Sequence, residues 1–100
     1  MEHQGLHYHF TAKIWKHNAA GGWHFVTLPK MYSTEIRENL KHEEEGWGRL
    51  KAKARVNNIT WDTAIWFDSK EKTYLLPIKA AIRKTGKIVS GESLEVDIWI

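Results

Sequence analysis

Hydrophobic and polar residues alternate with a period of two along several segments of the chain. Between Gly5 and Trp15 every second side chain is apolar, and the same pattern recurs over residues 47–58 and 93–100. Such alternation is typical of β-strands that bury one face, because successive side chains point to opposite sides. Three β-rich runs predict further strands, over residues 23–29, 59–67 and 72–77.

A first helix is predicted after Ser33, whose side chain suits an N-cap. Ile36 and Leu40 share one helix face at i, i+4, and Gly46 is the expected end. Residues 42–46 carry three consecutive carboxylates near that end, where the helix dipole disfavours negative charge. We therefore expect this segment to fray into a solvated loop.

A second helix is predicted over residues 78–85 and is closed by Gly86. Each helix follows a Leu-Pro pair, at residues 28–29 and 76–77. Proline lacks a backbone N–H and has a fixed φ, so it ends strand pairing and suits the entry to a helix. The sequence therefore predicts an abrupt corner from strand to helix at both places.

The order strand, strand, helix, strand occurs twice, over about residues 5–57 and 58–100, which predicts an internal duplication. The first two strands are expected to form a hairpin through a turn at residues 17–22. Short strands without a crossover between each pair favour an antiparallel sheet. We therefore predict a single domain over residues 1–100 with a mainly β fold. Its duplicated units form a double-split, mostly antiparallel barrel capped by two short helices, with Ile78 and Ile82 plugging one end.

Composition limits the classes of function. The 100-residue chain is 42% hydrophobic and has no cysteine, which excludes disulfides, thiolate nucleophiles and cysteine-ligated metals. Its amino terminus is polar and histidine-rich, and no apolar run approaches the length of a membrane span. We expect a cytoplasmic protein without a membrane partner. A formal net charge of +3 favours anionic partners only where the cations gather on one face.

The clearest gathering of cations is on the third predicted strand, where they occupy every second position: Arg49, Lys51, Lys53 and Arg55. They share one outward face at intervals of ~6.7 Å. Such an array suits the phosphates of nucleic acid, and Trp15 or Trp61 would offer a ring on which bases stack.

A purely structural role for these cations is the alternative. Glu95 and Asp97 lie on the outward face of the last predicted strand, which is the counterpart of the cationic strand in the repeat. Opposite charges on neighbouring strands stabilise a sheet modestly, within one chain or across a homodimer. The two hypotheses differ in whether the cations face these carboxylates or open water.

A second basic feature lies on the second predicted helix. Lys79 and Arg83 are one turn apart, and like charges at this spacing repel, so a compensating anion or carboxylate is expected. Trp23 and Trp61 are candidates for the rim of a pocket that would hold a small anionic ligand with these two cations. The alternative is that the two cations form the solvated side of an amphipathic helix.

Neither a metal centre nor a catalytic motif is predicted. His7 and His9 share a strand face and His24 would approach across the hairpin, but no suitably spaced carboxylate completes a ligand set. The serines lack a nucleophile-elbow pattern, and no phosphate loop occurs. We expect no enzyme, no cofactor and no metal.

Resemblance to a known family rests on Trp23 with Phe25 and Val26, on the Leu-Pro pair at residues 28–29, and on four longer segments: GWGRLKAKARV, WDTAIW, YLLPIKAAIRK and SGESLEVDI. Together they resemble a family of small bacterial proteins catalogued as domain of unknown function 1905. The resemblance extends from about Tyr8 to Ile98, and LPIKAAIRK is its most specific part. It implies a split β-barrel with a pseudo-twofold, similar in architecture to swapped-hairpin regulators that bind DNA as dimers. It implies no established activity.

These patterns together predict a non-catalytic binding module of unknown function, with a basic surface that seeks anions or nucleic acid. Two alternatives stay open. One is a small-molecule pocket lined by tryptophan with Lys79 and Arg83, and the other is a domain for protein–protein contact or dimerisation.

Overall fold

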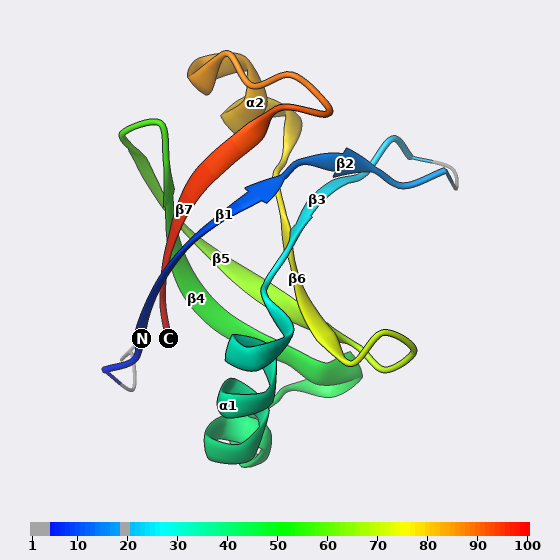
Figure 1. Ribbon diagram of the computed structural model, residues 1–100, viewed down its shortest axis with the longest axis vertical. Helices are drawn as coiled ribbons and strands as arrows, with labels where there is room; N and C mark the ends of the chain where they lie inside the picture. Colours follow the sequence, from blue (N-terminus) through cyan, green and yellow to red (C-terminus); the bar gives the residue numbers. More distant parts are fainter. Residues whose placement is uncertain (1–4, 19–20) are drawn as a thin grey trace.

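The fold is mainly β, as predicted: in the described part of the chain, seven strands form one antiparallel sheet and two α-helices accompany it (Figure 1). The computed structural model describes residues 5–18 and 21–100; Ala19 and Ala20 of the expected turn lie outside the described residues. The strands are β1 (His7–Lys13), β2 (Trp15–Lys16), β3 (His24–Thr27), β4 (Arg49–Val56), β5 (Ile59–Asp68), β6 (Thr73–Pro77) and β7 (Ser93–Trp99). The helices are α1 (Lys30–Leu40) and α2 (Ala80–Gly86), and two 3₁₀ turns, Lys41–Glu43 and Gly46–Gly48, lead into β4.

The strand order β1-β7-β4-β5-β6-β3-β2 makes the sheet curl into a barrel. Its two outermost strands, β1 and β2, are consecutive along the chain (Figure 1) and are separated only by Ile14. The predicted hairpin therefore exists only in part. Trp15 pairs with Phe25, whereas β1 pairs with β7 along its whole length. A strand that wraps a tightly coiled barrel changes partner where it bends.

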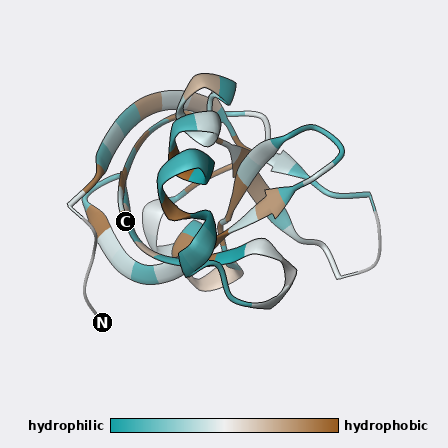
Figure 2. Cartoon of the chain, turned by 90° about the horizontal axis from the view of Figure 1, so that it is seen from below, coloured by the Kyte–Doolittle hydropathy of each residue, from teal (hydrophilic) through white to brown (hydrophobic). Residues whose placement is uncertain are grey.

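The alternation read from the sequence corresponds to the core. On β4 the inward side chains are all buried, and so are those on β7: Leu50, Ala52, Ala54, Val56, Leu94, Val96 and Ile98. The two helices lie at opposite ends of the barrel (Figure 1), and α1 crosses one opening when the barrel is viewed along its length (Figure 2). Ile78 is buried just before α2 and Ile82 packs partly buried against the core.

The predicted boundaries of the first helix were wrong at both ends. Helix α1 begins at Lys30, directly after Pro29, so the Leu-Pro corner supplies the entry and no N-cap serine is needed. Ser33 is fully buried inside the helix, where its Oγ accepts a hydrogen bond of 3.0 Å from the backbone N–H of Tyr74. The helix ends at Leu40, and Gly46 belongs to the second 3₁₀ turn.

The acidic segment after α1 was expected to be a solvated loop, which is wrong for Glu44. Only 10% of its side chain is exposed, and it accepts hydrogen bonds from Arg37 Nη1 and from the hydroxyl of Tyr74. Arg37 in turn lies over the ring of Phe67, with its Cζ atom 3.7 Å from the ring centroid. This polar cluster attaches the end of α1 to the barrel.

Helix α2 begins at Ala80, two residues later than predicted, so Lys79 precedes the helix. Gly86 closes it as predicted, but the residue that takes the left-handed conformation is Lys87, with φ of 54°. Its backbone N–H bonds to the carbonyls of Arg83 and Lys84. Within the described part of the chain, neither helix has the length and apolar character needed to cross a bilayer.

Candidate functional site

The outward faces of β4 and β5 form the centre of the candidate site. In the antiparallel register Arg49 lies opposite Trp66, Lys51 opposite Ala64, and Lys53 opposite Asp62. Because the inward residues of β4 are buried, all these side chains project from the outer surface of the barrel. The predicted cationic face of this strand therefore exists, and its neighbours on β5 are Trp66, Ala64 and Asp62.

A groove crosses this outer face from β4 to β6 and encloses about 590 Å³. Its depth comes from small residues: Ala64 and Pro77 line it and are themselves buried. Longer side chains rise around them, and among the described residues the lining contains four cations, one carboxylate and two indoles: Arg49, Lys51, Lys53, Lys79, Asp62, Trp23 and Trp66. We call this feature the cationic groove.

Strand pairing beyond β6 brings Trp23 and Lys79 into the groove. Phe25 pairs with Pro77, and the N–H of Ile78 donates to the carbonyl of His24 over 2.8 Å, so the ladder continues toward the start of α2. Trp23 and Lys79 are the next residues on either side. The two features that the sequence presented separately, the basic strand and the basic start of the second helix, thus line one hollow.

The cations of β4 have carboxylate partners at the edge of the groove, and these are not the expected ones. Arg49 pairs with Glu45, Lys51 Nζ lies 3.6 Å from Glu45 Oε2, and Lys53 Nζ lies 3.7 Å from Asp62 Oδ1. These pairs are largely exposed, and exposed ion pairs contribute little. Their charges therefore remain available to an incoming anion.

Strand β7 does lie beside β4, and Arg55 is opposite Asp97 in the register, as the structural alternative required. The side-chain contacts differ from that hypothesis. The Nη2 of Arg55 donates to Asn58 Oδ1 over 3.0 Å, whereas Glu95 and Asp97 contact histidines of β1.

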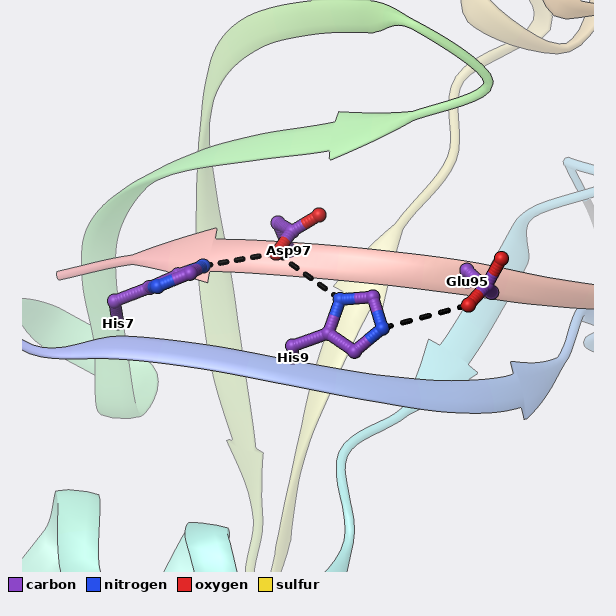
Figure 3. Close-up of polar contacts among 4 residues, drawn as sticks. All are labelled: His7, His9, Glu95 and Asp97. Atoms are coloured by element: carbon purple, nitrogen blue, oxygen red, sulfur yellow. Dashed lines mark hydrogen bonds and ion pairs between the residues drawn. The ribbon is translucent and has the colours of Figure 1, made fainter.

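His7 and His9 flank Asp97 on the surface formed by β1 and β7 (Figure 3). His7 Nε2 lies 2.8 Å from Asp97 Oδ1, His9 Nδ1 lies 3.1 Å from the same oxygen, and His9 Nε2 lies 3.5 Å from Glu95 Oε1. His24 is not part of this group; its Nδ1 lies 2.8 Å from the carbonyl of Gly22. Among the described residues, no three histidine or acidic side chains are arranged to hold a metal ion.

The histidine–aspartate contacts predict a pH dependence of stability. The hydrogen bond to Asp97 raises the pKa of His9 above its ordinary 6.5. Burial alone would raise the pKa of Asp97, but hydrogen bonds from His7 and His9 outweigh it and hold this pKa below its ordinary 3.8. The His9 contribution is complete below the unfolded pKa and is lost as pH rises through the folded value. The Asp97 contribution is complete above its unfolded pKa and is lost as pH falls.

We therefore expect Asp97→Asn to lower the melting temperature most between about pH 4 and pH 6.5, with a smaller difference from wild type at higher and lower pH. Thermal melts of the variant and the wild type at pH values below, within and above that range measure the difference in melting temperature. Glu71→Gln, which changes an exposed carboxylate in the β5–β6 loop, is the control. A pH-independent difference for Asp97→Asn would contradict the prediction.

Three predicted site residues lie outside the cationic groove: Arg55, described above, Arg83 and Trp61. Arg83 Nε donates to the carbonyl of Ile78 over 3.1 Å, so this guanidinium closes the corner before α2. Trp61 packs against the core, and its indole Nε1 is buried without a hydrogen-bond partner in the described residues. The residue that the sequence reading missed is Trp66. The outward position of Trp66 could be predicted from the sequence, because it lies five positions after Trp61 and an odd offset along a strand places two side chains on opposite faces.

The fold and the groove define a small split-barrel domain with helices at both ends and a ligand-sized cationic hollow on its outer face. The family model described as Domain of unknown function (DUF1905) matches residues 10–98, and the chain belongs to this family. The resemblance in LPIKAAIRK and its flanking segments is thereby confirmed. A comparison with curated proteins returned no match.

Proposed function

We propose that the protein is a non-catalytic binding module that holds anionic ligands in the cationic groove. The observation that supports this most directly is that Arg49, Lys51, Lys53 and Lys79 line one hollow in which Asp62 is the one carboxylate among the described lining residues. The volume of the hollow falls within the ~300–1,000 Å³ that is usual for ligand pockets. The same proposal places the protein in the cytoplasm, where phosphorylated compounds and nucleic acids are abundant.

Gathered cations favour an anion for an electrostatic reason. Like charges on neighbouring positions repel, and the repulsion is relieved when one anion contacts several of them. Lys51 and Lys53 follow each other on one face of β4 at ~6.7 Å, so a ligand with more than one phosphate contacts both. Lys79, which directly precedes α2, adds a cation from beyond β6 and gives the site a second side.

Inorganic polyphosphate of medium chain length is the probe for this proposal, because it offers phosphate charges and has no aromatic ring that could stack on tryptophan. We expect calorimetry to detect binding at about 50 mM salt and to show roughly tenfold or greater weakening at about 200 mM, since a few phosphate contacts release counterions. The double variant Lys51→Glu/Lys53→Glu should lose the binding.

A matched control keeps the change in net charge and moves it away from the groove. Lys13 and Lys70 are exposed residues of β1 and the β5–β6 loop, and Lys13→Glu/Lys70→Glu should retain most of the affinity. Equal losses in the two double variants would mean that the overall charge, and not the groove, binds the anion. No binding at low salt would overturn the proposal.

The alternative was a small-molecule pocket lined by tryptophan with Lys79 and Arg83. Trp23 and Lys79 do line the groove, whereas Arg83 and Trp61 do not. For dimerisation, the large apolar side chains that are exposed in the described chain, Trp23, Met31 and Val89, come from three separate elements or loops. We therefore give the anion-binding groove precedence over both.

A further inference from the structure

The cationic groove has two indoles as well as four cations, and charge alone does not explain them. Trp23 is 51% exposed, although burying such a ring would remove a large apolar area from water. Trp66 lies on the groove beside Arg49, whose Cζ is 5.8 Å from the indole centroid. A binder of simple inorganic anions needs neither ring.

Trp23 is held in a defined orientation. Its indole stacks on Phe25 with ring centroids 6.0 Å apart and an interplanar angle of 11°, and Phe25 is in turn 5.2 Å from Trp15. The Nε1 of Trp15 donates to Thr27 Oγ1 over 2.9 Å, which fixes the far end of this row of rings. The row thus ends at the groove in an exposed indole that is supported from behind by Phe25.

A rigid exposed indole next to several cations matches the chemistry of a nucleotide. A base has a flat π-face that stacks on tryptophan whatever its sequence identity, and the attached phosphates need lysine or arginine within reach. Lys79 neighbours Trp23 across the extended β3–β6 ladder, and Lys51 and Lys53 lie on the opposite side of the hollow. Ring and cations therefore meet in one site.

We infer that the cationic groove binds a nucleotide unit, with its base stacked on Trp23 and its phosphates held by Lys51, Lys53 and Lys79. This inference rests on the proposed function and names its ligand. The unit is presented either as a free nucleotide or within a single-stranded nucleic acid. A duplex is a poor ligand because its bases are already stacked on one another.

The test compares two labelled twelve-nucleotide chains that carry the same number of phosphates, oligo(dT) and a fully abasic DNA, by fluorescence anisotropy at about 50 mM salt. We expect oligo(dT) to bind roughly fivefold or more tightly, because stacking on an aromatic side chain is worth about that factor or more per base. Trp23→Ala should reduce the affinity for oligo(dT) to that for the abasic chain and leave the abasic chain unaffected. Trp23→Phe, which keeps a ring, should restore part of the difference.

Met31→Ala is the control, since Met31 is an apolar residue of α1 with 74% exposure that does not line the groove. It should change neither affinity. If a mononucleotide also binds, with the same dependence on Trp23, the ligand can be a free nucleotide. If only the oligonucleotide binds, the ligand is a single-stranded nucleic acid.

Equal, salt-sensitive affinities for oligo(dT) and the abasic chain would overturn the nucleotide inference and leave the anion-binding groove standing. Failure of both chains and of polyphosphate to bind at low salt would remove the two together. Duplex DNA binding as tightly as oligo(dT) would also overturn the inference, because no base is then free to stack.

Discussion

Ala64→Leu is expected to weaken polyphosphate and oligonucleotide binding by roughly tenfold or more, while the unfolding free energy changes by less than about 1 kcal/mol. Ala64 lies between Lys51 and the groove's Pro77 side, and its small side chain makes the hollow there. Leucine adds carbon atoms on the outer side of the sheet, where they fill the hollow without entering the core. No charge is altered, so a loss of affinity reports on shape.

The control for this variant is Thr60→Leu. Thr60 is an exposed residue of the same strand, on the same face, opposite Arg55 and outside the cationic groove. It should bind both probes as wild type does. Calorimetric titration and denaturant melts of the two variants give the comparison, and full affinity in Ala64→Leu would show that the ligand does not enter the hollow.

The largest effect on stability is expected at Glu44. Glu44→Ala should lower the unfolding free energy by about 2–3 kcal/mol, because the change leaves a buried hydroxyl without an acceptor. Tyr74 is fully buried and donates to Glu44 Oε2, and Arg37 Nη1 lies 3.2 and 2.9 Å from the two carboxylate oxygens. Burial raises the pKa of Tyr74 and the bond to Glu44 raises it further, so the phenol remains a proton donor throughout the physiological range.

Glu43→Ala is the matched control, since the neighbouring carboxylate is 46% exposed and its loss should cost less than about 0.5 kcal/mol. Adding Tyr74→Phe to Glu44→Ala should recover part of the lost stability, because the unpaired hydroxyl is then absent. Urea melts measure all three variants. Similar stabilities for Glu43→Ala and Glu44→Ala would mean that the cluster does not anchor α1.

The strands were predictable because one buried face imposes alternation on each segment independently of the others. This holds for β4 and β7, whose inward residues could be named from the sequence alone. The Leu-Pro corners were also readable, since proline acts locally on both the strand and the helix. The roles of Ser33 and Glu44 were predicted wrongly because both accept hydrogen bonds from Tyr74, which is far away in the sequence. Local sequence suggests a helix cap and a solvated acid, and it does not show this distant donor.

The groove depends on pairing between strands, and this limited its prediction. Its cations were predicted from the sequence in two separate groups. Arg49, Lys51 and Lys53 belong to the group on the third predicted strand, and Lys79 belongs to the group at the second predicted helix. What joins them is the register of β4, β5, β6 and β3, together with two small residues, Ala64 and Pro77, that carry no functional signal by themselves. The same limit applies to Trp66. Its outward position indicates a place in the groove only when the register pairs it with Arg49.

The pairing of β1 with β7 also determines when the barrel can close during synthesis. The β4–β5 hairpin joins neighbouring segments through Asn57 and Asn58, so it can pair as soon as it leaves the ribosome. Strand β1 has to wait, because His7 pairs with Trp99, and contacts of such long sequence separation form slowly. Until then β1 presents an unpaired edge beside exposed apolar residues, and the nascent chain needs protection from aggregation.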